Sequence, residues 1–92
     1  MQQNPPAPRV LVADDQADIL QALRLLLVDA EMHVELVNSV DGIRERVSAS
    51  PYDLLLMDLN YTRDTTSGRE GLELISEVRA RDRHLPIVVM TG

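Results

Sequence analysis

Residues 52–60 read Tyr52-Asp53-Leu54-Leu55-Leu56-Met57-Asp58-Leu59-Asn60, and this stretch decides the fold. Its centre, residues 54–57, is an apolar run that ends at the carboxylate of Asp58. A short apolar run beside turn residues is typical of a strand buried on both faces, as in a parallel sheet. A helix is the alternative, but the run is short for one and Pro51 lies just upstream. Because ligands of open parallel sheets bind beyond the carboxyl ends of the strands, Asp58 stands where a site is expected.

The flanking sequence predicts strands and helices in alternation. Runs rich in β-branched and aliphatic residues favour strands, and apolar residues spaced by three and four favour helices. The strands are expected at residues 9–13, 33–37, 54–57 and 86–90, and the helices at 16–30, 40–49 and from about 68 to 81. Residues 60–67 are polar and are expected to form a loop.

Capping residues support these helix boundaries. Asp14 or Asp15 is a candidate cap for the first helix, and Ser39 for the second. Ser67 and Glu70 have the spacing of a capping box at the start of the third helix.

The order β-α-β-α-β-α-β predicts a doubly wound α/β fold. Strands joined by helical crossovers pair in parallel through right-handed connections, and helices then cover both faces of the sheet. Residues 1–8 are polar and contain prolines, so we expect a flexible leader rather than a signal peptide, followed by one domain over residues 9–92.

Composition excludes several function classes. The net charge is −6 and aromatic content is 2%, which disfavours direct nucleic-acid binding by this segment. Cysteine is absent, so neither a disulfide framework nor a thiolate metal site is expected. No apolar run approaches the roughly 18 residues that span a bilayer, and a cytoplasmic location with no membrane contact is the expectation. No glycine-rich loop follows the first strand, which disfavours a nucleotide-binding Rossmann half.

Three carboxylates and one hydroxyl follow strands that lie side by side in such a sheet. Asp14, Asp15, Asp58 and Thr91 are expected to converge on one edge. Two like charges 4 Å apart repel by roughly 4 kcal/mol at an effective dielectric of about 20, so a cation is expected between the acids. All-oxygen ligands favour Mg²⁺, and a carboxylate beside the ion can attack phosphorus to form an aspartyl phosphate. The competing interpretation makes Asp14 and Asp15 helix caps and Asp58 an ordinary turn residue.

The chain resembles the receiver domain of two-component response regulators. The resemblance is carried by Val10-Leu-Val-Ala-Asp14-Asp15, by the stretch 52–60, by Gly71-Leu-Glu-Leu-Ile75 and by Pro86-Ile-Val-Val-Met-Thr91-Gly92. It implies a flavodoxin-like (CheY-like) parallel sheet of strand order 2-1-3-4. It also implies a signalling module rather than an enzyme.

The resemblance implies a role for each matching residue. Asp58 is the phosphoacceptor, and Thr91 contacts the phosphoryl group and shifts as a switch. Asp14 and Asp15 hold Mg²⁺, together with Asp58 and the backbone carbonyl of Asn60. The implied phosphodonor is a sensor histidine kinase, a phosphotransfer protein or a small acyl phosphate.

Two departures from the family pattern stand out. The family continues through a fifth strand, which carries a lysine, and two further helices, whereas this sequence ends at Gly92 and contains no lysine. We therefore expect a partial receiver domain with impaired phosphotransfer and an open sheet edge that favours a homodimer. The loop 60–67 is longer than the family's usual turn and resembles that of NtrC-type transcription regulators; a plain solvated loop is the simpler interpretation.

Two other functions compete with this one. Asp58-Leu-Asn60 loosely resembles the nucleophile motif of haloacid-dehalogenase-type phosphohydrolases, but that family places a carboxylate where this chain has an amide. A non-phosphorylated protein-interaction module that keeps the fold is the other candidate.

Overall fold

In the computed structural model, the described residues are 7–58 and 69–90. They form four strands and three helices in strict alternation. The strands are β1 (Arg9–Ala13), β2 (His33–Val37), β3 (Leu54–Asp58) and β4 (Ile87–Met90). The helices are α1 (Ala17–Asp29), α2 (Val40–Ala49) and α3 (Arg69–Arg81).

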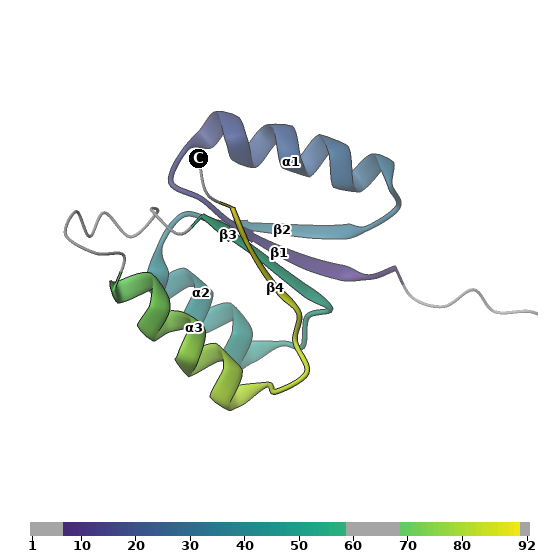
Figure 1. Ribbon diagram of the computed structural model, residues 1–92. Helices are drawn as coiled ribbons and strands as arrows, with labels where there is room; N and C mark the ends of the chain where they lie inside the picture. The colour runs from purple at the N-terminus through teal and green to yellow at the C-terminus, as the bar shows by residue number, and fades with distance from the viewer. Residues whose placement is uncertain (1–6, 59–68, 91–92) are drawn as a thin grey trace, which may run out of the picture.

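The strands form one parallel sheet in the order β2-β1-β3-β4. Helix α1 covers one face, and α2 and α3 lie side by side over the other (Figure 1). The crossovers put helices on both faces, as expected for strands that are apolar on both sides. The predicted doubly wound fold and its strand order are therefore confirmed.

Alternation along the central strands divides the core into two clusters, one on each face of the sheet. On the α2 and α3 face, Leu11, Leu55 and Met57 are fully buried against Ile43 and Leu74. On the α1 face, Val10, Val12 and Leu20 form the buried part, with partly buried aliphatic side chains around them. Burying each large aliphatic side chain stabilises the fold by about 1.5–3 kcal/mol.

The end of α1 is a complete Schellman motif. The backbone N–H of Glu31 donates to the carbonyl of Val28, and that of Met32 donates to the carbonyl of Leu27. Glu31 has φ of 64°, the left-handed conformation that this motif requires and that usually selects glycine. Met32 and Leu27 then pack in the same apolar cluster, which completes the cap.

The helix starts only partly follow the sequence prediction. Ser39 caps α2, because its hydroxyl accepts the backbone N–H of Gly42 at 2.9 Å. The predicted cap of α1 by Asp14 or Asp15 is wrong: the N-cap residue is Gln16, which makes no side-chain capping bond. Asp14 instead accepts the backbone N–H of Gln16 itself, one position before the helix.

Element ends differ from the prediction by one residue at four places. Helix α1 covers residues 17–29 rather than 16–30, β3 extends to Asp58, and β4 begins after Pro86. Proline has no N–H to give to a strand ladder, although its carbonyl accepts from Leu55 at 3.0 Å. The leader up to residue 6 and the loop 60–67 lie outside the described residues, and so does Ser67, the first residue of the predicted capping box. Among the described helices, none has the length and apolar character needed to cross a membrane.

Candidate functional site

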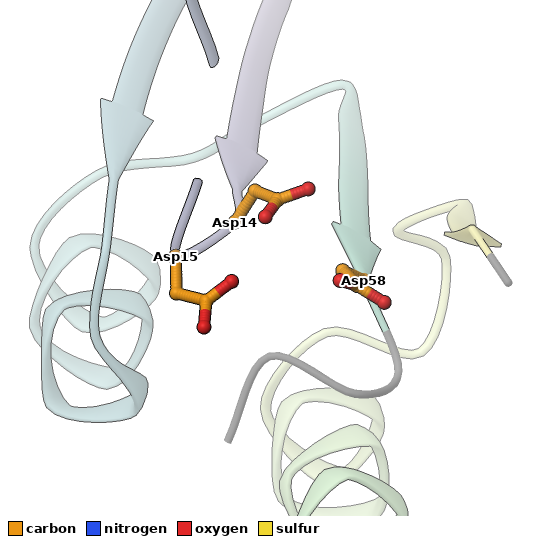
Figure 2. Close-up of side chains that lie close together, drawn as sticks. All are labelled: Asp14, Asp15 and Asp58. Atoms are coloured by element: carbon orange, nitrogen blue, oxygen red, sulfur yellow. The ribbon is translucent and has the colours of Figure 1, made fainter. Parts of the chain in front are cut away.

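The site begins with the ends of two neighbouring strands. β1 and β3 pair in parallel with Ala13 opposite Met57, so the residues that follow each of these lie at the same edge of the sheet. They are Asp14 and Asp58, and the chain turn into α1 adds Asp15 beside them (Figure 2). The convergence predicted for these three carboxylates is therefore present in the fold.

The three carboxylates are close enough to share one ion. Each offers an oxygen, and the three oxygens lie within 4.8 Å of one another. Asp14 is buried, Asp58 is half-buried and Asp15 is exposed. The group therefore runs from the buried side chain of Asp14 to the solvent-exposed side chain of Asp15.

Backbone contacts hold Asp14 in place. Its N–H donates to the carbonyl of Val37 at 3.2 Å, and its Oδ1 accepts the N–H of Gln16 at 2.9 Å. One carboxylate oxygen is thus tied to the main chain, and the other can serve as a ligand. Such fixed orientation is what a metal site requires of its ligands.

The electrostatics of the group favour a cation. Burial raises the pKa of Asp14, and the hydrogen bond and negative charge of Asp15 and the charge of Asp58 raise it further, while the N–H of Gln16 acts in the opposite direction. A divalent ion would offset this repulsion. An all-carboxylate donor set fits a hard ion such as Mg²⁺, which keeps water or phosphate oxygens in its remaining positions.

The other residues assigned from sequence are not placed. Asn60 and Thr91 lie outside the residues that the structure describes, so their roles stay predictions. A surface pocket of about 280 Å³ lies elsewhere, between the ends of α2 and α3, and Tyr52, Arg81 and Leu85 are among its lining residues. It contains none of the three carboxylates.

A second charged cluster was missed by the sequence reasoning. Glu35, in the middle of β2, accepts hydrogen bonds from Arg9, Arg46 and the hydroxyl of Tyr52. The signal was visible in the sequence as a carboxylate inside the apolar strand 33–37. It went unused because its partners are up to 26 residues away along the chain.

Comparison with known proteins agrees with this geometry. Residues 10–92 match the family model described as the response regulator receiver domain. Over 84 residues the chain is 31% identical to the transcriptional regulatory protein DltR of Streptococcus agalactiae, covering 91% of this chain and 35% of DltR. Over 86 residues it is 33% identical to the signal transduction histidine-protein kinase BarA of Shigella flexneri, covering 94% of this chain and 9% of BarA.

A solved structure shows the same architecture. The chemotaxis response regulator CheY4 of Vibrio cholerae superimposes with a TM-score of 0.78 at 25% identity, covering 90% of this chain and 67% of that one. Of the two relatives matched by sequence, the chain spans about a third of DltR and a small part of BarA.

Proposed function

The chain belongs to the response regulator receiver domain family, and on that premise we propose that Asp58 accepts a phosphoryl group beside a Mg²⁺ ion held by Asp14 and Asp15. One observation carries the proposal: oxygens of Asp14 and Asp15, which follow β1, and of Asp58, which ends β3, lie within 4.8 Å of one another at the carboxyl edge of the sheet. Asp58 is the member at the tip of β3, half-buried and facing the shared space (Figure 2).

The proposed reaction is a phosphoryl transfer. A carboxylate oxygen of Asp58 forms the new bond to phosphorus as the bond to the donor breaks, and the leaving group departs with its electron pair and takes up a proton. A bound Mg²⁺ would supply positive charge to the phosphoryl oxygens. Asp14 and Asp15 would hold that ion, and the backbone N–H of Gln16 fixes the orientation of Asp14. By the family pattern, Asn60 adds a carbonyl ligand and Thr91 a hydroxyl to the phosphoryl group.

The phosphodonor is proposed to be a protein phosphohistidine. Receiver domains take phosphoryl groups from histidine kinases, and the relatives of this chain include a kinase that contains such a segment. A phosphotransfer protein or a small acyl phosphate would present the same chemistry to Asp58. In this role the domain is a signalling module and not a classical enzyme.

The wider setting is also a proposal. The transcriptional regulator DltR suggests a gene-regulatory output, of which an NtrC-type protein is one form, and a cytoplasmic location follows from such a role. The domain is taken as residues 9–92. Strand β4 lies at the edge of the described sheet with Val88 47% exposed, so a homodimer through this edge is proposed as well.

The family match does not favour the alternatives weighed from sequence, a haloacid-dehalogenase-type phosphohydrolase and a non-phosphorylated interaction module. The acid pair after β1 has no place in the first, and an intact carboxylate cluster is not needed in the second.

The test is occupancy of Asp58. Wild-type chain with Mg²⁺ and beryllofluoride, a phosphoryl mimic, should show amide NMR shifts centred on Asp14, Asp15 and Asp58. Acetyl phosphate should add one phosphoryl group by mass, and slowly, because the sequence contains no lysine to stabilise the transferring group. Asp58→Asn should abolish both responses to the phosphoryl compounds. The matched control Asp41→Asn, an exposed carboxylate on α2, should leave them intact. Mg²⁺ binding without any response to beryllofluoride would rule out Asp58 as acceptor.

A further inference from the structure

Strand β2 is an edge strand of the described sheet whose apolar pattern does not define its register. Val34 and Leu36 pack in the cluster under α1, while Val37 packs in the cluster under α2 and α3. A one-residue slip of a strand exchanges its two faces. For β2, the exchange would still place aliphatic side chains on both sides. A polar interaction is therefore needed to select one register.

Glu35 supplies that interaction. It pairs with Leu11, so its side chain is on the α2 face, and it is 21% exposed. Its carboxylate accepts from Nη2 of Arg9 at 2.7 Å, from Nη1 of Arg46, and from the hydroxyl of Tyr52 at 3.1 Å. The hydrogen bond from Arg9, with those from Tyr52 and Arg46, lowers the pKa of Glu35 against the effect of burial, so the carboxylate is ionised.

These partners come from three separate parts of the fold. Arg9 starts β1, Arg46 is in the last turn of α2 and Tyr52 precedes β3. The Arg9 guanidinium also lies 4.9 Å from the centre of the Tyr52 ring and donates to the carbonyl of Pro51 at 3.1 Å. A shifted β2 would take Glu35 away from all three donors, and this carboxylate, 21% exposed, would lose its hydrogen bonds without full access to water in their place.

The register of β2 affects the acidic cluster, because the end of β2 lies beside the carboxyl end of β1. Val37 pairs with Ala13, and its carbonyl accepts the N–H of Asp14 at 3.2 Å. A slipped β2 would present a different carbonyl, or none, to that N–H. Asp14 would then lose one of its two hydrogen bonds to the backbone and keep the one that its side chain accepts from Gln16.

We propose that Glu35 is a positioning residue for the acidic cluster: it locks β2 in register with β1, and β2 holds the main chain of Asp14. The consequence for Mg²⁺ rests on the proposed function, whereas the consequence for the Asp14 amide does not. Glu35 touches neither the ion nor the phosphoryl group and acts through Val37.

The test compares Glu35→Leu and Glu35→Gln with wild type in two measurements. In metal-free protein, Glu35→Leu should speed amide hydrogen exchange at Asp14 and along β2 by about tenfold, the loss expected for roughly one hydrogen bond, while β3 stays protected. Mg²⁺ affinity, followed by amide NMR shifts, should fall about threefold to tenfold. Glu35→Gln should lie between, because its single amide oxygen can keep either the bond from Arg9 or the bonds from Arg46 and Tyr52, which end on the other oxygen of the carboxylate. Glu45→Gln, an exposed α2 variant, is the control and should match wild type.

Each outcome bears on the proposal. Wild-type exchange at Asp14 in Glu35→Leu would overturn it, as would equal acceleration in β2 and β3, which would mean a general loss of stability. If Glu35→Leu does not fold, the exchange at Asp14 in Glu35→Gln decides in the same way. If wild type itself fails to bind Mg²⁺, the proposed function fails, and the exchange measurement still tests the register lock.

Discussion

Replacing Asp14 by asparagine should stabilise the metal-free protein at neutral pH. Asp14 is 4% exposed and shares a space of 4.8 Å with two other carboxylates. Asparagine has nearly the same shape, and its carbonyl oxygen can still accept the N–H of Gln16, so the substitution removes charge and little else.

The magnitude follows from the charges. Two carboxylates 4.8 Å apart repel by roughly 3.5 kcal/mol at an effective dielectric of about 20. Solvent at Asp15 and Asp58 screens much of this, so we expect Asp14→Asn to raise the free energy of unfolding by about 1–2 kcal/mol at pH 7. For a domain of this size, each kcal/mol raises Tm by about 4–8 °C.

The effect should depend on pH with a definite sign. Burial first, and then the neighbouring acids, raise the pKa of Asp14 in the folded chain. Below the unfolded pKa of about 3.9 the carboxyl is protonated in both states, and the Asp14 contribution vanishes. As pH rises through the raised folded pKa, the wild type loses stability relative to Asp14→Asn, and the difference then levels off.

Thermal unfolding in EDTA from pH 3.5 to 8 measures this difference, and added Mg²⁺ should reverse it by stabilising wild type more than the variant. The exposed carboxylate Asp41, 87% exposed at its side chain, provides the control, and Asp41→Asn should change stability by less than about 0.5 kcal/mol. An Asp14→Asn protein no more stable than wild type at pH 7 without metal would refute the electrostatic reasoning.

Three further substitutions test the fold. Glu31→Gly should stabilise the chain by about 1 kcal/mol, since φ of 64° strains every residue with a Cβ; a lower Tm would show that the strain is not there. Ser39→Ala should lower the free energy of unfolding by about 1 kcal/mol, measured in urea, because α2 loses its cap. An unchanged urea midpoint would show that this cap does not stabilise the fold. Leu55→Ala, at a fully buried position, should lower the free energy of unfolding by about 2–5 kcal/mol. The control Leu72→Ala, at a position that is 57% exposed, should lower it by about 0.5 kcal/mol or less. Similar losses in the two variants would contradict the assigned core.

Sequence reasoning reached the fold because its signals were local. The apolar run 54–57 and the capping hydroxyl of Ser39 each depend on a few neighbouring residues, and both are present as expected. The carboxylate cluster was also predictable, because parallel strands bring their carboxyl ends to one edge whatever the details of packing.

The sequence predictions failed where contacts between distant parts of the chain determine the local structure. Gln16 is the N-cap of α1, and the N–H of Asp14 donates to the carbonyl of Val37, a contact that no local pattern encodes. The partners of Glu35 are likewise brought together only by the completed sheet. The roles of Asn60 and Thr91 stay predictions from the family pattern, since both lie outside the described residues.

The uneven division of the core has a mechanical consequence. Of the thirteen residues of α1, Leu20 is buried, while Leu25 and Leu26 are more than 60% exposed. On the opposite face of the sheet, α2 and α3 are joined by an ion pair, in which Nε of Arg44 lies 2.8 Å from Oε2 of Glu77. We therefore expect α1 to detach from the sheet by local unfolding more often than α2 and α3. The helix that follows the acid pair would then have the lowest local stability of the described helices.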